Sequence, residues 1–550
     1  MQQSSRSTRG DKLTEPHRPW IAAAGDRRNM KSIGIPLLAA LLVFSGAGAA
    51  ESPAPQASVV VEADVRGRPY DPMVFGGFLE HFDNQIYGGV FEPGSALADP
   101  QGFRRDVIAA LRELKVPVIR WPGGCFVDGY DWQKGVGPHR EAHGDYRWGV
   151  IEPNTFGTHE FIELCRSVGA EPYLCQNGLA TVQEMAHWVA YCNATEGEFA
   201  ARRRQNGHAE PFKVRFWSVG NERYDDAYIR RVRDGALAMK QVDPSILVTC
   251  AGSQGGRGKV GFKVSAKLLQ EAGPHLDYLS VHNYWLDRGN ELPRYDYLTA
   301  ITQSEWPEAY LAFVCASLSA AGQTDRLKIA FDEWNLRAWQ HPGFPRNAVK
   351  DYADPTVRDL VAKRRQQNDL ASQYTMADAL FAASFLNACL RHADRVTMAN
   401  IAPLVNTRGP LFVHPGGLVK RTHFHTLAMY ANLLQPRVVG TRVTGDTLTR
   451  EADAVAVVDA LATVDESGRH WALALVNRHP SEAIACAVTI KDRLLAGTFR
   501  ATVLTGASAD DYNDVAHPDR VAPQAQSLTF QAGRAHLPPH SLTIVRVAVE

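Results

Sequence analysis

Two glutamates that follow short apolar runs are the residues best placed for acid–base chemistry. Glu222 ends the run Phe216–Glu222, and Glu333 follows the apolar residues of Ile329–Glu333. They are 111 residues apart, which corresponds to about three successive strand–helix units. Paired carboxyl groups cleave glycosidic bonds when one protonates the leaving oxygen and the other attacks or directs water. On spacing alone, two carboxylates held in structural ion pairs fit equally well.

Polar and aromatic residues also end four other apolar runs of the same region. They are Glu80 and His81, Arg120 and Trp121, Gln176 and Asn177, and His282, Asn283 and Tyr284. For one such run alone, a capping or loop role is the simpler interpretation. Because the parallel strands of a barrel present their carboxyl ends at one face, six runs that end in this way indicate a shared site.

Eight strands that alternate with amphipathic segments must position these residues. The strands are expected at Val74–Leu79, Val118–Trp121, Pro172–Cys175, Val214–Val219, Ile246–Ala251, Tyr278–Val281, Lys328–Phe331 and Arg395–Ala399. The helices are expected at Phe103–Leu114, His159–Val168, Thr181–Asn193, Asp225–Val242 and Gln367–Arg391. This alternation predicts an α/β protein with a (β/α)8 TIM barrel over residues 71–432. Its length requires long loops, which we expect at Gly135–Thr158, Gly252–Gly261 and Trp285–Pro307.

The hydrophobic period changes in the last part of the chain. Short alternating strands are expected at Val455–Val458, His470–Val476, Ala483–Ile490, Phe499–Leu504 and Ser541–Val547. Such strands, separated by Gly, Asp, Pro and Asn, are typical of an antiparallel β-sandwich, which we place at residues 433–550. Residues 51–70 contain one further strand, Val59–Glu62, which we expect to join this jelly-roll-like sandwich.

Residues 1–50 have the pattern of a leader that contains a signal peptide over residues 30–50. A polar stretch precedes Met30-Lys31, an apolar run follows, and small residues end it at Ser45–Ala50. A positive start, a short apolar core and a small-residue exit define a signal peptide, and the apolar run is shorter than the ~20 residues that span a bilayer. We therefore expect translation to start at Met30 and the product to be secreted or periplasmic. The alternative is a membrane anchor.

The overall composition argues against charged partners. The chain of 550 residues has 59 Lys and Arg and 59 Asp and Glu, so its formal net charge is zero. Without a charge excess there is no long-range field to attract nucleic acid or an anionic membrane. The eight cysteines show neither a CxxC nor a zinc-binding pattern. Most are expected to be buried thiols, with one or two disulfides compatible with export.

Four motifs in this order closely resemble those of glycoside hydrolase family 51. They are Gly76–His81 with Ile86–Gly89 after it, Ile119–Gly124, Phe216–Glu222 and Ile329–Asn335. The resemblance covers the chain from about residue 59 to its end. It implies a barrel with a β-sandwich and the α-L-arabinofuranosidase activity that is most common in the family.

The resemblance also implies a retaining double displacement. Glu333 would be the nucleophile, and Glu222 would be the general acid and then the base. Retention requires carboxyl groups about 5–5.5 Å apart. The negative charge of Glu333 is one means of keeping Glu222 protonated until the nucleophile is consumed.

The remaining family roles concern sugar contacts and positioning. By the resemblance, Asn221 would hydrogen-bond the hydroxyl next to the anomeric carbon. Glu80 and Arg120 would hold the other hydroxyls and orient the carboxylates. Tyr284 would position the nucleophile, with His282 close by.

Two positions depart from the common family pattern. Where many members have Asn after the two glycines, this chain has Cys125, which replaces an amide donor with a weak thiol. Pro403 stands where a sugar-contacting Gln is common. Because both carboxylates remain, we interpret these changes as a subgroup difference in sugar contacts.

The sequence thus predicts an exo-acting enzyme that releases terminal non-reducing α-L-arabinofuranosyl residues without a cofactor or metal. The expected substrates are arabinan, arabinoxylan or arabino-oligosaccharides, and association into a homo-oligomer would fit the family. One alternative is an endo-β-glucanase that uses the same carboxylates. The other is a non-catalytic carbohydrate-binding protein, which would not require both carboxylates.

Overall fold

The computed structural model describes most of the chain after the expected leader. The described residues are 56–62, 67–145, 147–148, 151–255, 261–286, 295–338 and 371–548. The expected leader with its signal peptide lies outside them, as do parts of the loops expected at Gly252–Gly261 and Trp285–Pro307.

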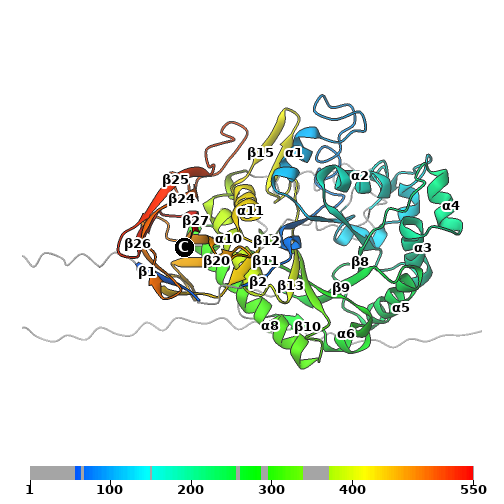
Figure 1. Ribbon diagram of the computed structural model, residues 1–550. Helices are drawn as coiled ribbons and strands as arrows, with labels where there is room; N and C mark the ends of the chain where they lie inside the picture. Colours follow the sequence, from blue (N-terminus) through cyan, green and yellow to red (C-terminus); the bar gives the residue numbers. More distant parts are fainter. Residues whose placement is uncertain are drawn as a thin grey trace, which may run out of the picture. The chain divides into compact units, whose positions relative to one another are not determined.

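Eight parallel strands close into a barrel, which confirms the predicted fold class (Figure 1). In order around the barrel they are β3 (Gly76–Phe78), β4 (Val118–Trp121), β7 (Glu171–Gln176), β8 (Phe216–Val219), β9 (Leu247–Gln254), β11 (Tyr278–Leu286), β12 (Lys328–Arg337) and β13 (Val396–Ile401). The pairing of β13 with β3 completes the ring. Each strand expected from the sequence overlaps one of these eight.

Several strand boundaries differ from the expectation. The segment before β3 is a 3-10 helix, Pro72–Phe75, because Asp71 accepts a hydrogen bond from Met73 N at 3.0 Å and starts a turn there. Strands β11 and β12 run past the apolar residues that marked them in the sequence. Their polar residues therefore lie within the barrel wall instead of in the loops after it.

Helices surround the barrel. They are α1 (Arg105–Glu113), α2 (Thr158–Val168), α3 (Val182–Asn193), α4 (Glu198–Gln205), α5 (Asp226–Val242), α6 (Ala266–Glu271), α7 (Tyr297–Ile301), α8 (Trp306–Ala320), α10 (Met376–Arg391) and α11 (Thr422–Leu433). Side-chain caps define several starts: the Thr181 hydroxyl accepts from Glu184 N before α3, and the Asp225 carboxylate accepts from Tyr228 N before α5. The loop expected at Gly135–Thr158 contains the short hairpin β5 (His143–Gly144) and β6 (Ile151–Glu152).

A layer of side chains fills the amino-terminal half of the barrel interior. It is formed by Val118, Tyr173, Phe216, Tyr278, Ala330 and Met398, one from each of six strands. Packing such layers is how barrels of this kind exclude a central pore. Polar groups are thereby confined to the carboxyl ends of the strands.

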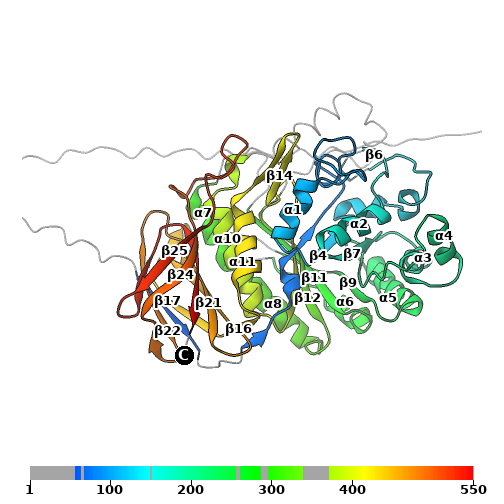
Figure 2. The same ribbon diagram turned by 45° about the horizontal axis from the view of Figure 1, so that its top comes forward.

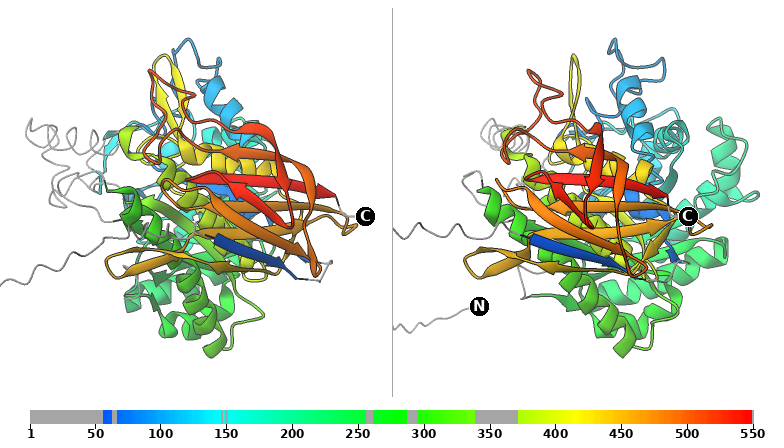
Figure 3. Two further views of the ribbon diagram at one scale, coloured as in Figure 1. Left: turned by 90° about the vertical axis from the view of Figure 1, so that its left-hand side faces the viewer. Right: turned by 60° about the vertical axis from the view of Figure 1, so that its left-hand side comes forward.

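Two sheets form a sandwich after the barrel (Figure 3). One contains β1 (Gln56–Val61), β17 (Thr441–Gly445), β22 (Ile484–Ile490), β23 (Arg493–Leu494) and β26 (Arg534–Leu537). The other contains β2 (Arg68–Pro69), β16 (Arg437–Val439), β20 (Val458–Val464), β21 (His470–Asn477), β24 (Gly497–Leu504), β25 (Gln524–Phe530) and β27 (Ser541–Ala548). Strand β1, drawn in blue among the orange and red strands, pairs antiparallel with β17 and parallel with β22. Smaller hairpins are β14 (Leu411–His414) with β15 (Gly417–Lys420) and β18 (Thr447–Arg450) with β19 (Asp453–Ala456).

Helix α10 lies between the barrel and the sandwich (Figure 2). Asn387 Nδ2 and Arg391 Nη1 on this helix each lie 3.0 Å from a carboxylate oxygen of Asp459 on β20. Arg478, just after β21, approaches the same carboxylate at 3.2 Å. The buried Asp459 therefore joins the two parts of the molecule through ionic hydrogen bonds.

All eight cysteines are free thiols. Six are buried, and Cys125 and Cys315 are half-buried. Among the described helices, none combines the length and apolar character needed to cross a bilayer.

Candidate active site

Glu222 lies in a tight turn directly after β8. Its backbone has a φ of +43°, in the left-handed region that non-glycine residues rarely adopt, and Gly220 just before it has a φ of +68°. The side chain is 36% exposed. The turn thus presents a carboxyl group at the open end of the barrel, where an incoming molecule can reach it.

Glu333 is the buried member of the pair. Arg120 Nη1 on β4 donates to its Oε1 at 2.7 Å, and the Tyr284 hydroxyl on β11 donates to its Oε2 at 3.0 Å. Burial raises the pKa of Glu333, and the Glu222 charge acts in the same direction, whereas His282 and Arg120 oppose the increase. Burial therefore disfavours the ionised form of Glu333, whereas the donors Arg120 and Tyr284 and the cation His282 support it.

The two carboxyl groups lie close together. Glu222, His282 and Glu333 each offer one side-chain atom, and these atoms lie within 4.8 Å of one another. Such a short separation suits direct attack by one carboxylate, because a water molecule between them would require roughly 6.5–9.5 Å. The same three side chains form a geometrically possible metal site, although Arg120 and Tyr284 already bond both oxygens of Glu333.

His282 bridges the carboxylates. Its Nδ1 lies 3.1 Å from Glu222 Oε1 and 3.6 Å from Glu333 Oε2, and its Nε2 lies 2.9 Å from Asp332 Oδ1. Burial alone would lower the pKa of His282, but the charges of Glu333 and Asp332 outweigh it and raise the pKa to about 10. The imidazole is therefore a cation near neutral pH, with both nitrogens donating.

Asp332 contacts both Arg120 and His282 beneath Glu333 in the barrel. It accepts from the Tyr173 hydroxyl at 2.8 Å and from the Ser280 hydroxyl at 2.5 Å. Burial opposes ionisation of Asp332, yet Arg120 and His282 outweigh it and lower its pKa to about 2. Asp332 is thus a permanent anion that holds the two cations next to Glu333.

A β-bulge brings Asp332 and Glu333 to the same groups. Ser280 pairs with Ala330, but His282 pairs with Glu333, so β12 contains one more residue than β11 between these pairs. Side chains of a regular strand alternate between its two faces, and a bulge redirects them. Neighbouring residues of β12 therefore both reach Arg120 and His282.

Asn221 and Cys125 lie on the opposite side of Arg120. The Asn221 Oδ1 accepts from Arg120 Nη2 at 2.8 Å. Its Nδ2 lies 3.7 Å from Cys125 Sγ. The residue that departs from the family pattern thus contacts Asn221, the amide that the sequence predicts to hydrogen-bond the sugar.

Glu80 lies in a closely packed pocket beside Arg120. Its Oε1 accepts from Phe126 N at 2.8 Å and from Trp148 Nε1 at 2.9 Å. A Cβ at Gly123 would lie 2.5 Å from Glu80 Cγ, so only glycine fits there. Burial raises the pKa of Glu80 well above its usual value, and the Glu333 charge adds to this. The buried Oε2 has no hydrogen-bond partner among the described residues.

The structure brings all seven predicted site residues to one end of the barrel, but other strand-end residues lie elsewhere. His81 is buried in a network with Glu152 Oε2 at 2.6 Å and Trp121 Nε1 at 2.8 Å. Pro403 follows β13 in a cis peptide bond with Ala402. Asp332 is a member of the site that the sequence motifs do not mark, although it is adjacent to Glu333 in the sequence.

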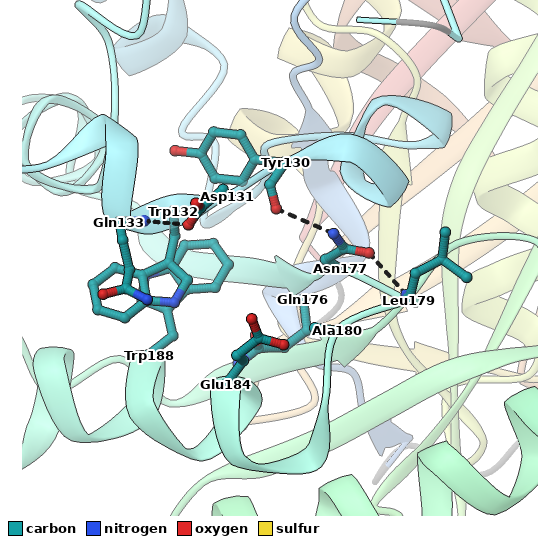
Figure 4. Close-up of a pocket in the computed structure, with 10 residues that line it drawn as sticks. All are labelled: Tyr130, Asp131, Trp132, Gln133, Gln176, Asn177, Leu179, Ala180, Glu184 and Trp188. Carbon is teal, nitrogen blue, oxygen red and sulfur yellow. Dashed lines mark hydrogen bonds between the residues drawn. The ribbon is translucent and has the colours of Figure 1, made fainter. Parts of the chain in front are cut away.

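Gln176 and Asn177 line a separate crevice of about 230 Å³ (Figure 4). The crevice lies between the segment after β4 and the start of α3, and Asn177 Nδ2 donates to the Tyr130 carbonyl across it at 3.3 Å. The other lining residues are Asp131, Trp132, Gln133, Leu179, Ala180, Glu184 and Trp188. These two strand-end residues therefore support loops and do not contact the carboxylate pair.

Comparison with known proteins places this site in a family. Residues 110–297 match the model of the α-L-arabinofuranosidase 1 domain, and residues 332–541 match that of the α-L-arabinofuranosidase C-terminal domain. α-L-Arabinofuranosidase C of Emericella nidulans is 32% identical over 455 residues, which cover 78% of this chain and 86% of that protein. The intracellular exo-α-(1→5)-L-arabinofuranosidase 1 of Bacillus subtilis is 32% identical over 392 residues, or 69% of this chain and 75% of that protein.

Solved structures agree with this relationship. An α-L-arabinofuranosidase from Thermotoga maritima in complex with arabinose superposes with a TM-score of 0.75 at 29% identity, covering 90% of this chain and all of that one. A family 51 α-L-arabinofuranosidase from Bifidobacterium longum gives 0.76 at 27% identity, covering 90% of this chain and 99% of that one. With the carboxylate pair in place and the match extending through barrel and sandwich, the chain belongs to the α-L-arabinofuranosidases of glycoside hydrolase family 51.

Proposed function

We propose that this α-L-arabinofuranosidase releases terminal α-L-arabinofuranosyl residues by a retaining double displacement, with Glu333 as nucleophile and Glu222 as acid/base. The observation that carries the proposal is the approach of the two carboxyl groups to within 4.8 Å. This separation allows attack on the sugar by one carboxylate while the other protonates the leaving oxygen.

In the first step Glu333 attacks the anomeric carbon, and Glu222 gives its proton to the glycosidic oxygen. The bond between the anomeric carbon and that oxygen breaks, and an ester bond to Glu333 forms. The donors from Arg120 and Tyr284 hold the attacking carboxylate in place. Positioning of this kind removes much of the entropic barrier to the reaction.

In the second step Glu222 removes a proton from water, and the resulting hydroxide attacks the anomeric carbon. The ester bond breaks and returns the electron pair to Glu333. Consumption of the Glu333 charge in the first step lowers the affinity of Glu222 for its proton, which suits its change from acid to base. Two inversions at one carbon give net retention.

We also propose the substrates and the export that the sequence predicts. The substrates are arabinan, arabinoxylan or arabino-oligosaccharides, and export through a signal peptide over residues 30–50 is the proposed route to them. In contrast, the relative from Bacillus subtilis is named as intracellular. N-terminal sequencing of protein from the culture medium or periplasm tests this, because an intact Met1 inside the cell would contradict it.

Two substitutions test the catalytic roles. Glu333→Ala should abolish turnover of every arabinofuranoside. Glu222→Ala should keep some activity on aryl substrates with good leaving groups, limited by the second step, and should form arabinofuranosyl azide when azide is added. Reversed phenotypes would mean that the two roles are exchanged. Cleavage of a soluble β-glucan, with no release from 4-nitrophenyl α-L-arabinofuranoside, would instead indicate an endo-glucanase.

A further inference from the structure

A buried ion pair adjoins the acid/base residue. Asp128 Oδ1 and Oδ2 accept from Arg223 Nε and Nη2 at 3.0 and 2.9 Å, and Arg223 directly follows Glu222 in the chain. The Asp128 side chain is 1% exposed and that of Arg223 is 22% exposed. A two-point contact of this kind fixes the orientation of a guanidinium as well as its position.

Three loops of the barrel converge on this pair. Asp128 lies in the 3-10 helix Cys125–Gly129 after β4, and Arg223 lies in the turn after β8. Gly178, after β7, fills the space between them. A Cβ at Gly178 would lie 3.0 Å from Gly220 Cα and 3.2 Å from both Arg223 Cδ and Asp128 Oδ1. The turn that carries Glu222 is therefore packed closely against a neighbouring loop, at a point where only a glycine fits.

The Asp128 side of the contact is itself fixed. Phe126, two residues earlier, donates its backbone N–H to Glu80 at 2.8 Å. Its ring stacks on His81 with the ring centres 4.7 Å apart. The 3-10 helix is thus tied to the barrel wall at a point next to the carboxylate that contacts Arg223.

The turn that carries Glu222 and Arg223 needs such support. The backbone φ of Glu222, +43°, is unfavourable for a residue with a Cβ. Strained backbone of this kind persists only where the surrounding structure fixes it. The side chain is also the more exposed of the two catalytic carboxyls. The orientation of Glu222 therefore depends strongly on the residues that hold its turn.

A second cation shares the same anion. Arg147 Nη2 also contacts Asp128 Oδ2. Without the Asp128 charge, two guanidinium groups would face each other across the turn and repel. Asp128 thus holds Arg223 by attraction and offsets the repulsion between Arg223 and Arg147.

We propose that Asp128 is a positioning residue that acts through Arg223 to hold Glu222 in line with the leaving oxygen. The proposal rests on the acid/base role of Glu222 proposed above. Asp128 itself is buried, and it contacts Arg223, the residue that follows Glu222. Its effect should therefore appear in proton transfer to the leaving group, and not in binding of the arabinosyl unit.

The test compares substrates with good and poor leaving groups. For Asp128→Asn, kcat/KM on arabino-oligosaccharides should fall by roughly 10²-fold, the loss expected when a catalytic group is displaced by about 1 Å. On 2,4-dinitrophenyl α-L-arabinofuranoside, whose dinitrophenolate group leaves without protonation, kcat/KM should stay near the wild-type value. Asp128→Glu, which keeps the charge, should restore part of the lost rate.

Asp131→Asn is the matched control. Asp131 lies three residues after Asp128, accepts from Gln133 N at 3.0 Å and lines the crevice of Figure 4. It should leave both substrates unaffected. Arg223→Gln provides a second measurement if Asp128→Asn folds poorly, and it should show the same selective loss.

The outcomes separate this proposal from the proposed function. An equal loss on both substrates, or no loss on either, in both Asp128→Asn and Arg223→Gln would overturn the positioning role. If Glu222→Ala itself shows no dependence on the leaving group, the acid/base assignment fails. If Glu222→Ala shows that dependence and the Asp128 and Arg223 variants do not, only the positioning role fails.

Discussion

Removal of the Tyr284 hydroxyl should shift the acidic side of the pH–rate profile to higher pH. The hydroxyl donates to Glu333 Oε2 at 3.0 Å, and Tyr284→Phe deletes this bond while keeping the ring. A hydrogen bond stabilises the ionised carboxylate more than the neutral acid. Its loss therefore raises the pKa of Glu333 further above the value that burial already sets. Because the nucleophile must be ionised to attack, activity at acidic pH should fall.

The size of the shift follows from the energy of the bond. A hydrogen bond to a charged group contributes about 1.5–3 kcal/mol, and one pKa unit corresponds to about 1.4 kcal/mol. Arg120 and His282 remain as cations near Glu333 and compensate in part. We therefore expect the acidic side of the profile to move up by about one pH unit, toward the lower end of that range.

The assay is kcat/KM for 4-nitrophenyl α-L-arabinofuranoside from the acidic to the neutral range. Tyr310→Phe is the control, because it deletes the hydroxyl of another buried tyrosine, which contacts Ser253 Oγ at 2.7 Å. It should leave the acidic side in place. An unchanged profile for Tyr284→Phe, or a shift to lower pH, would refute the proposed positioning of the nucleophile.

Two further predictions concern stability. Burial lowers the pKa of His423 to about 4, so its folded form stays neutral between that pH and its unfolded value of about 6.5. The unfolded chain then binds the extra proton and stability falls as pH drops through this window. Between neutral pH and pH 4, the free energy of unfolding measured in urea titrations should fall by about 3 kcal/mol less for His423→Phe than for the wild type. An equal fall for both proteins would contradict this. Asp459→Ala leaves Arg391 and Arg478 without their buried anion and should cost about 3–5 kcal/mol of unfolding free energy. Removal of the exposed Asp394, which contacts Arg68 at 3.5 Å, should cost less than about 1 kcal/mol, and a similar cost for both would contradict the role of Asp459.

Local pattern was sufficient to predict the barrel. Each strand is a short apolar or β-branched run between helical segments, and each of the eight expected runs is a strand of the closed sheet. The proximity of Glu222 and Glu333 could also be predicted, because the carboxyl ends of parallel strands must meet at one face. The resemblance of the motifs around Glu222 and Glu333 to the family then favoured a catalytic pair over a structural ion pair.

Irregular backbone was not predictable in the same way. The bulge in β12 places Asp332 and Glu333 on common partners, whereas strict alternation would separate them. The sequence around Asp332 is apolar on its N-terminal side and shows no glycine or proline to mark the bulge. Asp332 could be found from sequence only as the neighbour of a catalytic residue.

Contacts between distant loops could not be predicted from the sequence either. Asp128 and Arg223 are 95 residues apart, and nothing in the residues near either indicates the other. Gln176 and Asn177 end a strand like the true site residues, yet they face the crevice of Figure 4. Which strand-end residue points to the barrel axis depends on the loops that pack around it.

The proposed mechanism depends most directly on Glu333 as the residue that forms the covalent intermediate. Glu222→Ala incubated with 2,4-dinitrophenyl α-L-arabinofuranoside should accumulate this intermediate, because the first step needs no acid and the second lacks its base. Peptide mapping by mass spectrometry should then find one arabinosyl unit on the carboxylate of Glu333. An arabinosyl unit on any other residue, or an unmodified enzyme that releases the inverted sugar, would contradict the account.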